Sequence, residues 1–181
     1  GESLVVLGSG GIGLNIMQAA SLVSANPIIA VDLYDSRLSL AKKFGATHVI
    51  NSKKSDFCSE IRKIVGNNLD VFIDNTGLKD IIEKGYELIH KKGRLVLVGV
   101  PKIGQNINIF SLPLHFGKQI TGSFGGECVP DKDIPRYLNL LLSGKINFDG
   151  LVTERYKLDE INLAISRIKN GQSIGRVLID L

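Results

Sequence analysis

Residues 3–13 read SLVVLGSGGIG and residues 28–32 read IIAVD, and these two stretches decide the fold. The first is an apolar run that ends in the pattern G-x-G-x-x-G at residues 8–13, and an apolar-periodic segment follows it. The second is a β-branched run that ends in Asp32, 19 residues after Gly13. A strand, a glycine-rich turn, a helix, a second strand and an acid at its end form the dinucleotide-binding fingerprint. The sequence therefore predicts a dinucleotide site.

The glycines of this turn each have a mechanical reason to lack a side chain. Gly8 permits the tight turn out of the strand, Gly10 lets the backbone approach a diphosphate, and Gly13 lets the helix pack closely on the sheet. The first turn of the following helix presents unpaired N–H groups and the positive end of the helix dipole. The backbone donors of Gly11 and Ile12 are therefore the predicted contacts of the diphosphate.

Asp32 and Arg37 decide which dinucleotide the sequence favours. The Asp32 carboxylate can accept hydrogen bonds from both hydroxyls of the adenosine ribose, and it would repel a 2′-phosphate. NAD is therefore favoured over NADP. Arg37 lies at the start of the next predicted helix, where its guanidinium could bond the ribose or tolerate a phosphate.

Short β-branched runs alternate with amphipathic segments along the first two thirds of the chain. The predicted strands are residues 4–7, 28–31, 47–50, 71–74, 94–98 and 119–124. The predicted helices are residues 11–23, 36–44, 56–65 and 79–90, and Gly45, Gly66 and Gly93 are predicted to end three of them. Such alternation predicts an α/β fold, a Rossmann-type doubly wound parallel sheet of six strands with helices on both faces.

The alternation of predicted strands and helices changes after residue 123. This change divides the chain into a predicted dinucleotide-binding domain, 1–123, and a C-terminal segment, 124–181. This segment is predicted to contain a helix over 131–142, an extended stretch over 151–158, a helix over 159–169 and a strand over 176–179. It does not repeat the nucleotide-binding half.

Composition is that of an ordinary globular α/β protein, with 44% hydrophobic and 22% charged residues in 181. No apolar run approaches the ~20 residues of a membrane span, and no signal peptide is visible, so we expect a cytoplasmic protein without a membrane partner. The net charge of +4 comes from scattered lysine pairs, and aromatic residues make up 6%. A nucleic-acid surface needs clustered basic residues with interleaved aromatics, so no nucleic-acid partner is expected.

Several further runs together give a family resemblance. They are GSGGIGL at 8–14, VD at 31–32 followed by Arg37, KFGATHVI at 43–50, DNTG at 74–77, GRLVLVGVP at 93–101 and GSFGG at 122–126. These runs closely resemble those of zinc-type alcohol dehydrogenases, in the medium-chain dehydrogenase/reductase family. The resemblance covers essentially the whole chain, and the stretch LDEINLA at 158–164 looks like the family's returning C-terminal part.

The resemblance implies roles that the residues alone do not assign. Thr76 would lie by the adenine and its ribose. Val98 and Ser123 would offer backbone carbonyls, and Phe124 its backbone N–H, to the nicotinamide carboxamide, which fixes the ring for hydride transfer. Arg176 resembles the family's pyrophosphate-contacting arginine, displaced by one position.

In the zinc branch of this family an N-terminal domain holds the catalytic zinc through cysteine and histidine ligands. The resemblance implies that this domain is missing here, that zinc belongs only to it, and that the alcohol or carbonyl substrate is reached through it. His48, His90 and His115 are scattered and are expected to be structural, and Cys58 and Cys128 alone make no tetrahedral zinc site. No catalytic residue is assigned.

We therefore expect the NAD(H)-binding portion of a zinc-type alcohol or polyol dehydrogenase, which binds NAD(H) but does not oxidise alcohols alone. It would position the nicotinamide for hydride transfer with a primary or secondary alcohol, an aldehyde or a ketone. The family also implies a homodimer or higher homo-oligomer, in which a strand at residues 106–109 pairs with its mate across a dimer axis.

Other classes share parts of this pattern. A zinc-free quinone or enoyl reductase of the same superfamily shares the domain but usually prefers NADPH, against which Asp32 argues. A methyltransferase that binds adenosyl-methionine usually has an acid just before the first glycine, whereas Val6 and Leu7 precede Gly8 here. A non-catalytic NAD-binding module also remains compatible with the sequence, which does not identify the substrate.

Overall fold

The short β-branched runs form one parallel sheet in the computed structural model, which describes residues 1–181. The sheet comprises β1 (Leu4–Leu7), β2 (Ile28–Asp32), β3 (His48–Asn51), β4 (Leu69–Asp74), β5 (Ile89–Leu97) and β6 (Gln119–Gly122). The intervening helices are α1 (Gly11–Leu22), α2 (Asp35–Lys43), α3 (Phe57–Val65) and α4 (Lys79–Leu88). The predicted Rossmann-type fold class is confirmed.

The strand order is β3-β2-β1-β4-β5-β6, with every neighbouring pair parallel. The chain winds outward from β1 to β3 in one direction and then returns to place β4 on the other side of β1. The loops that follow β1 and β4 therefore leave the sheet next to each other, and an open α/β sheet binds ligands at this kind of crevice.

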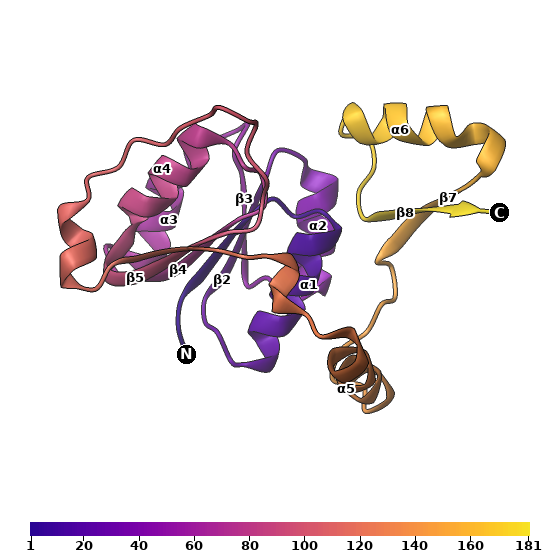
Figure 1. Ribbon diagram of the computed structural model, residues 1–181, viewed down its shortest axis with the longest axis horizontal. Helices are drawn as coiled ribbons and strands as arrows, with labels where there is room; N and C mark the ends of the chain where they lie inside the picture. Colours follow the sequence, from indigo (N-terminus) through magenta and orange to yellow (C-terminus); the bar gives the residue numbers. More distant parts are fainter.

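Two apolar layers cover the two faces of the sheet. Because successive side chains of a strand point to opposite faces, Val5 and Leu7 of β1 join one cluster and Leu4 and Val6 join the other. The first cluster packs under α3 and α4, and the second packs under α1 and α2. Figure 1 shows these two helix pairs on opposite sides of the strands.

One stretch departs from the prediction, because residues 89–93 belong to β5 and not to the end of a helix. The helix α4 ends at Leu88, and Gly93 is inside the strand and does not stop a helix. A Cβ on Gly93 would lie 2.9 Å from the carbonyl oxygen of Asp70 and 3.0 Å from that of Leu69. Gly93 therefore permits close approach of β4, at a register shift between the two strands. Gly66 is the C-cap of α3 and Gly45 follows the C-cap of α2, as predicted.

The C-terminal segment follows the predicted order of helix, strand, helix and strand. Its elements are the short 3₁₀ turn η2 (Gly125–Glu127), α5 (Pro130–Leu142), β7 (Val152–Lys157), the 3₁₀ turn η3 (Leu158–Glu160), α6 (Ile161–Lys169) and β8 (Arg176–Asp180). β7 and β8 pair in parallel as a separate sheet, which lies beyond α2 in Figure 1. The domain boundary at residue 123 stays a prediction.

The segment between β5 and β6 contains the 3₁₀ turn η1 (Leu112–Phe116) and no strand within the single chain, including at residues 106–109. Ile107 and Ile109 nevertheless pack against the first apolar cluster. None of the helices combines the length and the apolar character that crossing a bilayer requires.

A hydrogen-bonded cluster joins the amino ends of β1, β4 and β5. Asp70 Oδ2 accepts from the backbone nitrogen and the hydroxyl of Ser3, both at 2.8 Å, and Oδ1 pairs with His90 Nε2 at 3.0 Å. Burial raises the pKa of the Asp70 carboxyl, but the hydrogen bonds from Ser3 and His90 outweigh it and hold that pKa below its usual value.

We predict that Asp70→Asn lowers the free energy of unfolding by about 1–3 kcal/mol at pH 7. The folded-state pKa of Asp70 is depressed, so its stabilisation is present above the unfolded pKa near ~4 and is lost as the pH falls through the folded value. Urea unfolding at about pH 7 and about pH 3 should show a smaller difference between variant and parent at the lower pH. The exposed Asp149→Asn is the control, and a pH-independent difference for Asp70→Asn would contradict the prediction.

Candidate functional site

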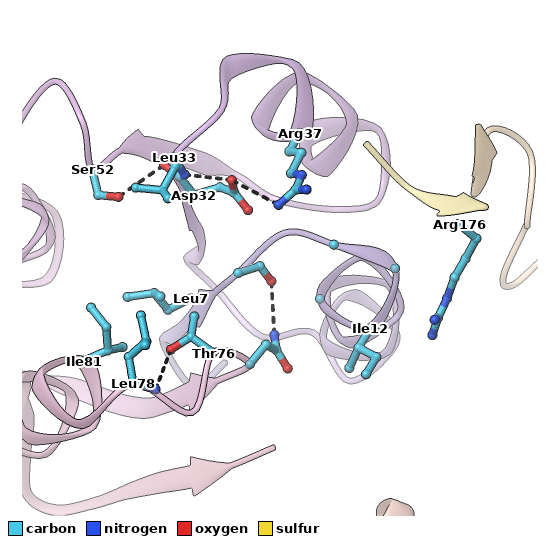
Figure 2. Close-up of a pocket in the computed structure, with 15 residues that line it drawn as sticks. Leu7, Ile12, Asp32, Leu33, Arg37, Ser52, Thr76, Leu78, Ile81 and Arg176 are labelled. Atoms are coloured by element: carbon cyan, nitrogen blue, oxygen red, sulfur yellow. Dashed lines mark hydrogen bonds and ion pairs between the residues drawn. The ribbon is translucent and has the colours of Figure 1, made fainter. Parts of the chain in front are cut away.

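A pocket of about 400 Å³ opens at the carboxyl ends of β1, β2 and β4 (Figure 2). In this view Asp32 and Arg37 lie on one side of it, and Thr76, Leu78 and Ile81 lie on the other. Its lining comprises Leu7, Gly8, Gly10, Gly11, Ile12, Gly13, Asp32, Leu33, Arg37, Ser52, Asn75, Thr76, Leu78, Ile81 and Arg176. The crevice expected from the strand order is therefore a real cavity.

The glycine-rich turn forms one wall of the pocket. Gly8 has a φ of +98°, a conformation that favours glycine. A Cβ on Gly13 would overlap the carbonyl oxygen of Gly8, so α1 could not lie this close to the end of β1. A Cβ on Gly10, in contrast, would meet no protein atom within 4 Å. Gly13 therefore serves packing inside the protein, whereas Gly10 leaves space on the pocket side.

The amino end of α1 points its donors at the pocket without a capping side chain. Gly10 is the N-cap, no side chain accepts from the first turn, and that turn contains no acidic residue. The N-terminus of α3 differs, because there Asp56 accepts from the backbone nitrogen of Ser59 at 2.9 Å. Unpaired backbone N–H groups and the helix dipole make the first turn of α1 favourable for an anion.

Asp32 lies in the pocket with its carboxylate held by backbone donors. The Ser9 nitrogen donates to Oδ2 at 2.8 Å, while the nitrogens of Leu33 and Tyr34 donate to Oδ1 at 2.7 and 3.2 Å. Arg37 Nη1 is 3.9 Å from Oδ1. Because Oδ2 accepts only one of these hydrogen bonds, it keeps capacity to accept from a ligand hydroxyl.

A second buried carboxylate, that of Asp74, supports the opposite wall from behind. Its Oδ1 accepts from the backbone nitrogen and hydroxyl of Thr76, and its Oδ2 accepts from the Gly77 nitrogen. Asn75, which follows Asp74 in the chain, donates from Nδ2 to the Gly8 carbonyl at 3.1 Å. The buried Oδ1 of the same amide has no hydrogen-bond partner. Asn75 is a lining residue that the sequence did not single out, although it lies in the quoted DNTG run.

The C-terminal segment contributes one lining residue, Arg176, which is remote in sequence from all the others. The side chain of Arg176 reaches from β8 toward the end of α1 (Figure 2), and a Cβ on Gly11 would lie 2.7 Å from its Cδ. Arg37 Nε and Nη2 donate to the Ser173 carbonyl at 3.0 and 2.7 Å. The displacement of Arg176 by one position in the sequence therefore does not keep its side chain out of the pocket.

Val98, Ser123 and Phe124 are the predicted site residues that do not line this pocket. They follow β5 and β6, and so they lie at the same edge of the sheet as the pocket. The Val98 nitrogen donates to the Asp74 carbonyl, and the Ser123 nitrogen donates to the Leu97 carbonyl. These two hydrogen bonds use the nitrogens of Val98 and Ser123 and do not involve their carbonyl oxygens. Their contacts with a nicotinamide stay a prediction.

The metal-ligating side chains do not fit a zinc site. No group of three or more histidine, cysteine, aspartate or glutamate side chains could hold a metal ion. Burial raises the pKa of the Cys58 thiol, and desolvation with the nearby Asp133 carboxylate raises that of Cys128, whereas zinc takes the thiolate.

Comparison with known proteins adds to this geometry. The family described as zinc-binding dehydrogenase matches residues 11–143. An S-(hydroxymethyl)glutathione dehydrogenase of Paracoccus denitrificans is 31% identical over 189 residues, covering 99% of this chain and 50% of that protein.

Solved structures of similar chains are also dehydrogenases. Benzyl alcohol dehydrogenase from Acinetobacter calcoaceticus superposes with a TM-score of 0.89 at 36% identity, over 99% of this chain and 50% of that one. A protein from Sinorhizobium meliloti 1021, bound to NADP, superposes with a TM-score of 0.83 at 27% identity, over 100% of this chain and 53% of that one. The chain thus spans about half the length of these relatives.

We predict that Gly13→Ala destabilises the fold by several kcal/mol, on the order of 2–4, because its Cβ would overlap the Gly8 carbonyl oxygen and force α1 away from β1. Thermal and urea unfolding measure the change. Gly10→Ala, three residues earlier in the same glycine-rich turn, is the matched control. Its free energy of unfolding should change by less than about 1 kcal/mol. Equal effects of the two substitutions would contradict this account of the turn.

Proposed function

The chain belongs to the zinc-binding dehydrogenase family, and we propose that it supplies the NAD(H)-binding site of an alcohol or polyol dehydrogenase. The observation that carries the proposal is the convergence of three features in one pocket. These are the uncapped amino end of α1, the guanidinium of Arg176 above it, and the Asp32 carboxylate at the end of β2.

Each feature suits one part of a dinucleotide. The backbone N–H groups of Gly11 and Ile12 would donate to the diphosphate, and Arg176 would add a positive charge from the other side. The free capacity of Asp32 Oδ2 would accept from the ribose hydroxyls of the adenosine. Thr76 lies on the far wall, where the adenine and its ribose would pass.

The environment of Asp32 supports NAD(H) over NADP(H) as the cofactor. A 2′-phosphate would approach the Asp32 carboxylate, which is largely buried, and two like charges close together in such surroundings repel. Arg37 Nη1 lies 3.9 Å from Asp32 Oδ1 and would offset part of this repulsion, although two hydrogen bonds from Nε and Nη2 hold the guanidinium on the Ser173 carbonyl. The Sinorhizobium meliloti protein that binds NADP is evidence that related chains accept the phosphate.

The nicotinamide half would extend toward the ends of β5 and β6. There the carbonyls of Val98 and Ser123 and the N–H of Phe124 would bond the carboxamide and fix which face of the ring meets the substrate. Bound NAD(H) would accept or donate the hydride that interconverts an alcohol with an aldehyde or ketone. The part played by this chain is to bind and orient the ring, because correct alignment of the two reacting carbons lowers the barrier to transfer.

We also propose that the protein is a homodimer or a higher homo-oligomer, built on the open side of β6. β6 pairs only with β5, so its other edge has no partner strand within the chain. Large apolar side chains are exposed on the neighbouring segment, namely Val100, Ile103, Phe110, Leu112 and Phe116. An open strand edge beside exposed apolar side chains favours association.

Sedimentation velocity is expected to show a dimer or larger species, and Phe110→Asp is expected to shift it toward monomer. The Phe110 side chain is 71% exposed, so the substitution leaves the core of the single chain intact. Leu142→Asp, at an 84% exposed position on α5, is the control and should leave the species unchanged. A parent protein that stays monomeric at high concentration would contradict the prediction.

Isothermal titration is expected to show binding of NAD(H) at least about tenfold tighter than binding of NADP(H), since the 2′-phosphate meets the Asp32 carboxylate. Gly10→Ala should weaken NAD(H) binding about tenfold, because its methyl group would occupy pocket space that the diphosphate needs. Its melting temperature should stay nearly unchanged, because the methyl group meets no protein atom within 4 Å. Equal affinity for both dinucleotides would overturn the cofactor assignment. Unchanged affinity in Gly10→Ala would overturn the placement of the diphosphate.

A further inference from the structure

Arg37 links two parts of the protein that are remote in sequence. It lies in the first turn of α2 and donates Nε–H and Nη2–H to the same carbonyl oxygen, that of Ser173. The Arg37 side chain is 21% exposed, so these charged hydrogen bonds are largely shielded from water. Charged donors in such surroundings make the stronger hydrogen bonds of a protein.

Ser173 lies in the connection from α6 to β8, and the same connection is seated on Tyr34 beside Arg37. Gly171 there has a φ of +69°, and a Cβ at this position would lie 2.6 Å from Cζ of the Tyr34 ring. The Ser173 side chain is buried as well. The connection therefore rests directly on the start of α2, and Arg37 is its polar attachment there.

Arg176 follows Ser173 by only three residues. Its backbone nitrogen donates to the Leu151 carbonyl at 2.7 Å, and the Gly175 nitrogen donates to Thr153 Oγ1 at 3.1 Å. These bonds tie the start of β8 to the other C-terminal strand, while Arg37 ties the connection to α2. The position of the Arg176 side chain over Gly11 thus depends on how the connection is held against the dinucleotide-binding half.

We propose that Arg37 is a positioning residue for Arg176. By holding the Ser173 carbonyl, Arg37 fixes the connection over residues 171–175 and sets the Arg176 guanidinium at the amino end of α1, where the diphosphate of a dinucleotide would bind. This inference rests on the proposed NAD(H) function. It differs from a direct contact of Arg37 with the ribose, because its effect reaches the ligand through Arg176.

The structure offers a matched control for the charge of Arg37. Lys53 Nζ lies 4.1 Å from the centre of the Tyr34 ring, and the Arg37 guanidinium lies 5.1 Å from the same ring. No hydrogen bond or ion pair joins the Lys53 side chain to the C-terminal segment, and Lys53 is not a lining residue of the pocket. Lys53→Gln therefore removes a nearby positive charge but keeps the attachment of the connection.

The test compares ligands with and without a diphosphate, by isothermal titration of adenosine and of ADP-ribose. Arg37→Gln is expected to weaken ADP-ribose binding about tenfold and adenosine binding less than twofold, with Lys53→Gln near the parent for both. Arg176→Gln should show the same pattern, and the double variant should bind ADP-ribose no more weakly than Arg176→Gln alone. Arg37→Lys keeps the charge but offers a single donor nitrogen in place of two, and it should recover part of the lost affinity.

Hydrogen exchange without ligand provides a second measurement that needs no binding. The amides of residues 173–178 should exchange about tenfold faster in Arg37→Gln than in the parent, and not in Lys53→Gln. Unchanged exchange, equal losses for adenosine and ADP-ribose, or additive effects of the two arginine substitutions would each overturn the inference and leave the proposed function standing. A parent protein that binds neither ligand would overturn the proposed function, and this inference with it.

Discussion

The hydrogen bond from the Ser9 backbone to the Asp32 carboxylate is the contact on which the site depends. It ties the glycine-rich turn after β1 to the end of β2 at a distance of 2.8 Å, between two residues that are both buried. The same carboxylate accepts from the nitrogens of Leu33 and Tyr34 and so also shapes the entry to α2. A single buried charge thus fixes two of the segments that form the pocket, and its free acceptor capacity is available because backbone donors already hold it in place.

Much of the fold could be predicted from the sequence because its signals are local. The spacing of the glycines, the alternation of β-branched runs with amphipathic segments, and the acid after the second run each reflect contacts between near neighbours. The resemblance to zinc-type alcohol dehydrogenases, drawn from quoted runs such as residues 74–77, is confirmed by the family match. The exception is Gly93, read as the end of a helix. Its actual role is to let β4 approach β5, and that depends on a neighbouring strand that no local pattern reveals.

The candidate site could be predicted where a short run of neighbouring residues carries the signal. The glycine-rich turn, Asp32 and Thr76 line the pocket as expected from their motifs. The amide of Asn75 was overlooked because its importance comes from a hydrogen bond to Gly8, 67 residues away. The attachment of Arg37 to Ser173 spans 136 residues and uses a backbone carbonyl, an acceptor that every residue carries, so no side-chain pattern could indicate it.

Charge alone does not give a bound dinucleotide one direction along the pocket. Under the proposed function, the negative diphosphate meets Arg176 and the positive end of α1, whereas the neutral ribose meets Asp32. Reversing the molecule would bring the adenosine half toward the ends of β5 and β6 and would leave the Asp32 carboxylate facing the nicotinamide end, without changing the position of the diphosphate. The diphosphate contacts therefore supply affinity but no direction. Direction has to come from the walls on either side, where Asp32 and the Asp74-supported turn at Thr76 form one end and the backbone beyond Val98 and Ser123 forms the other.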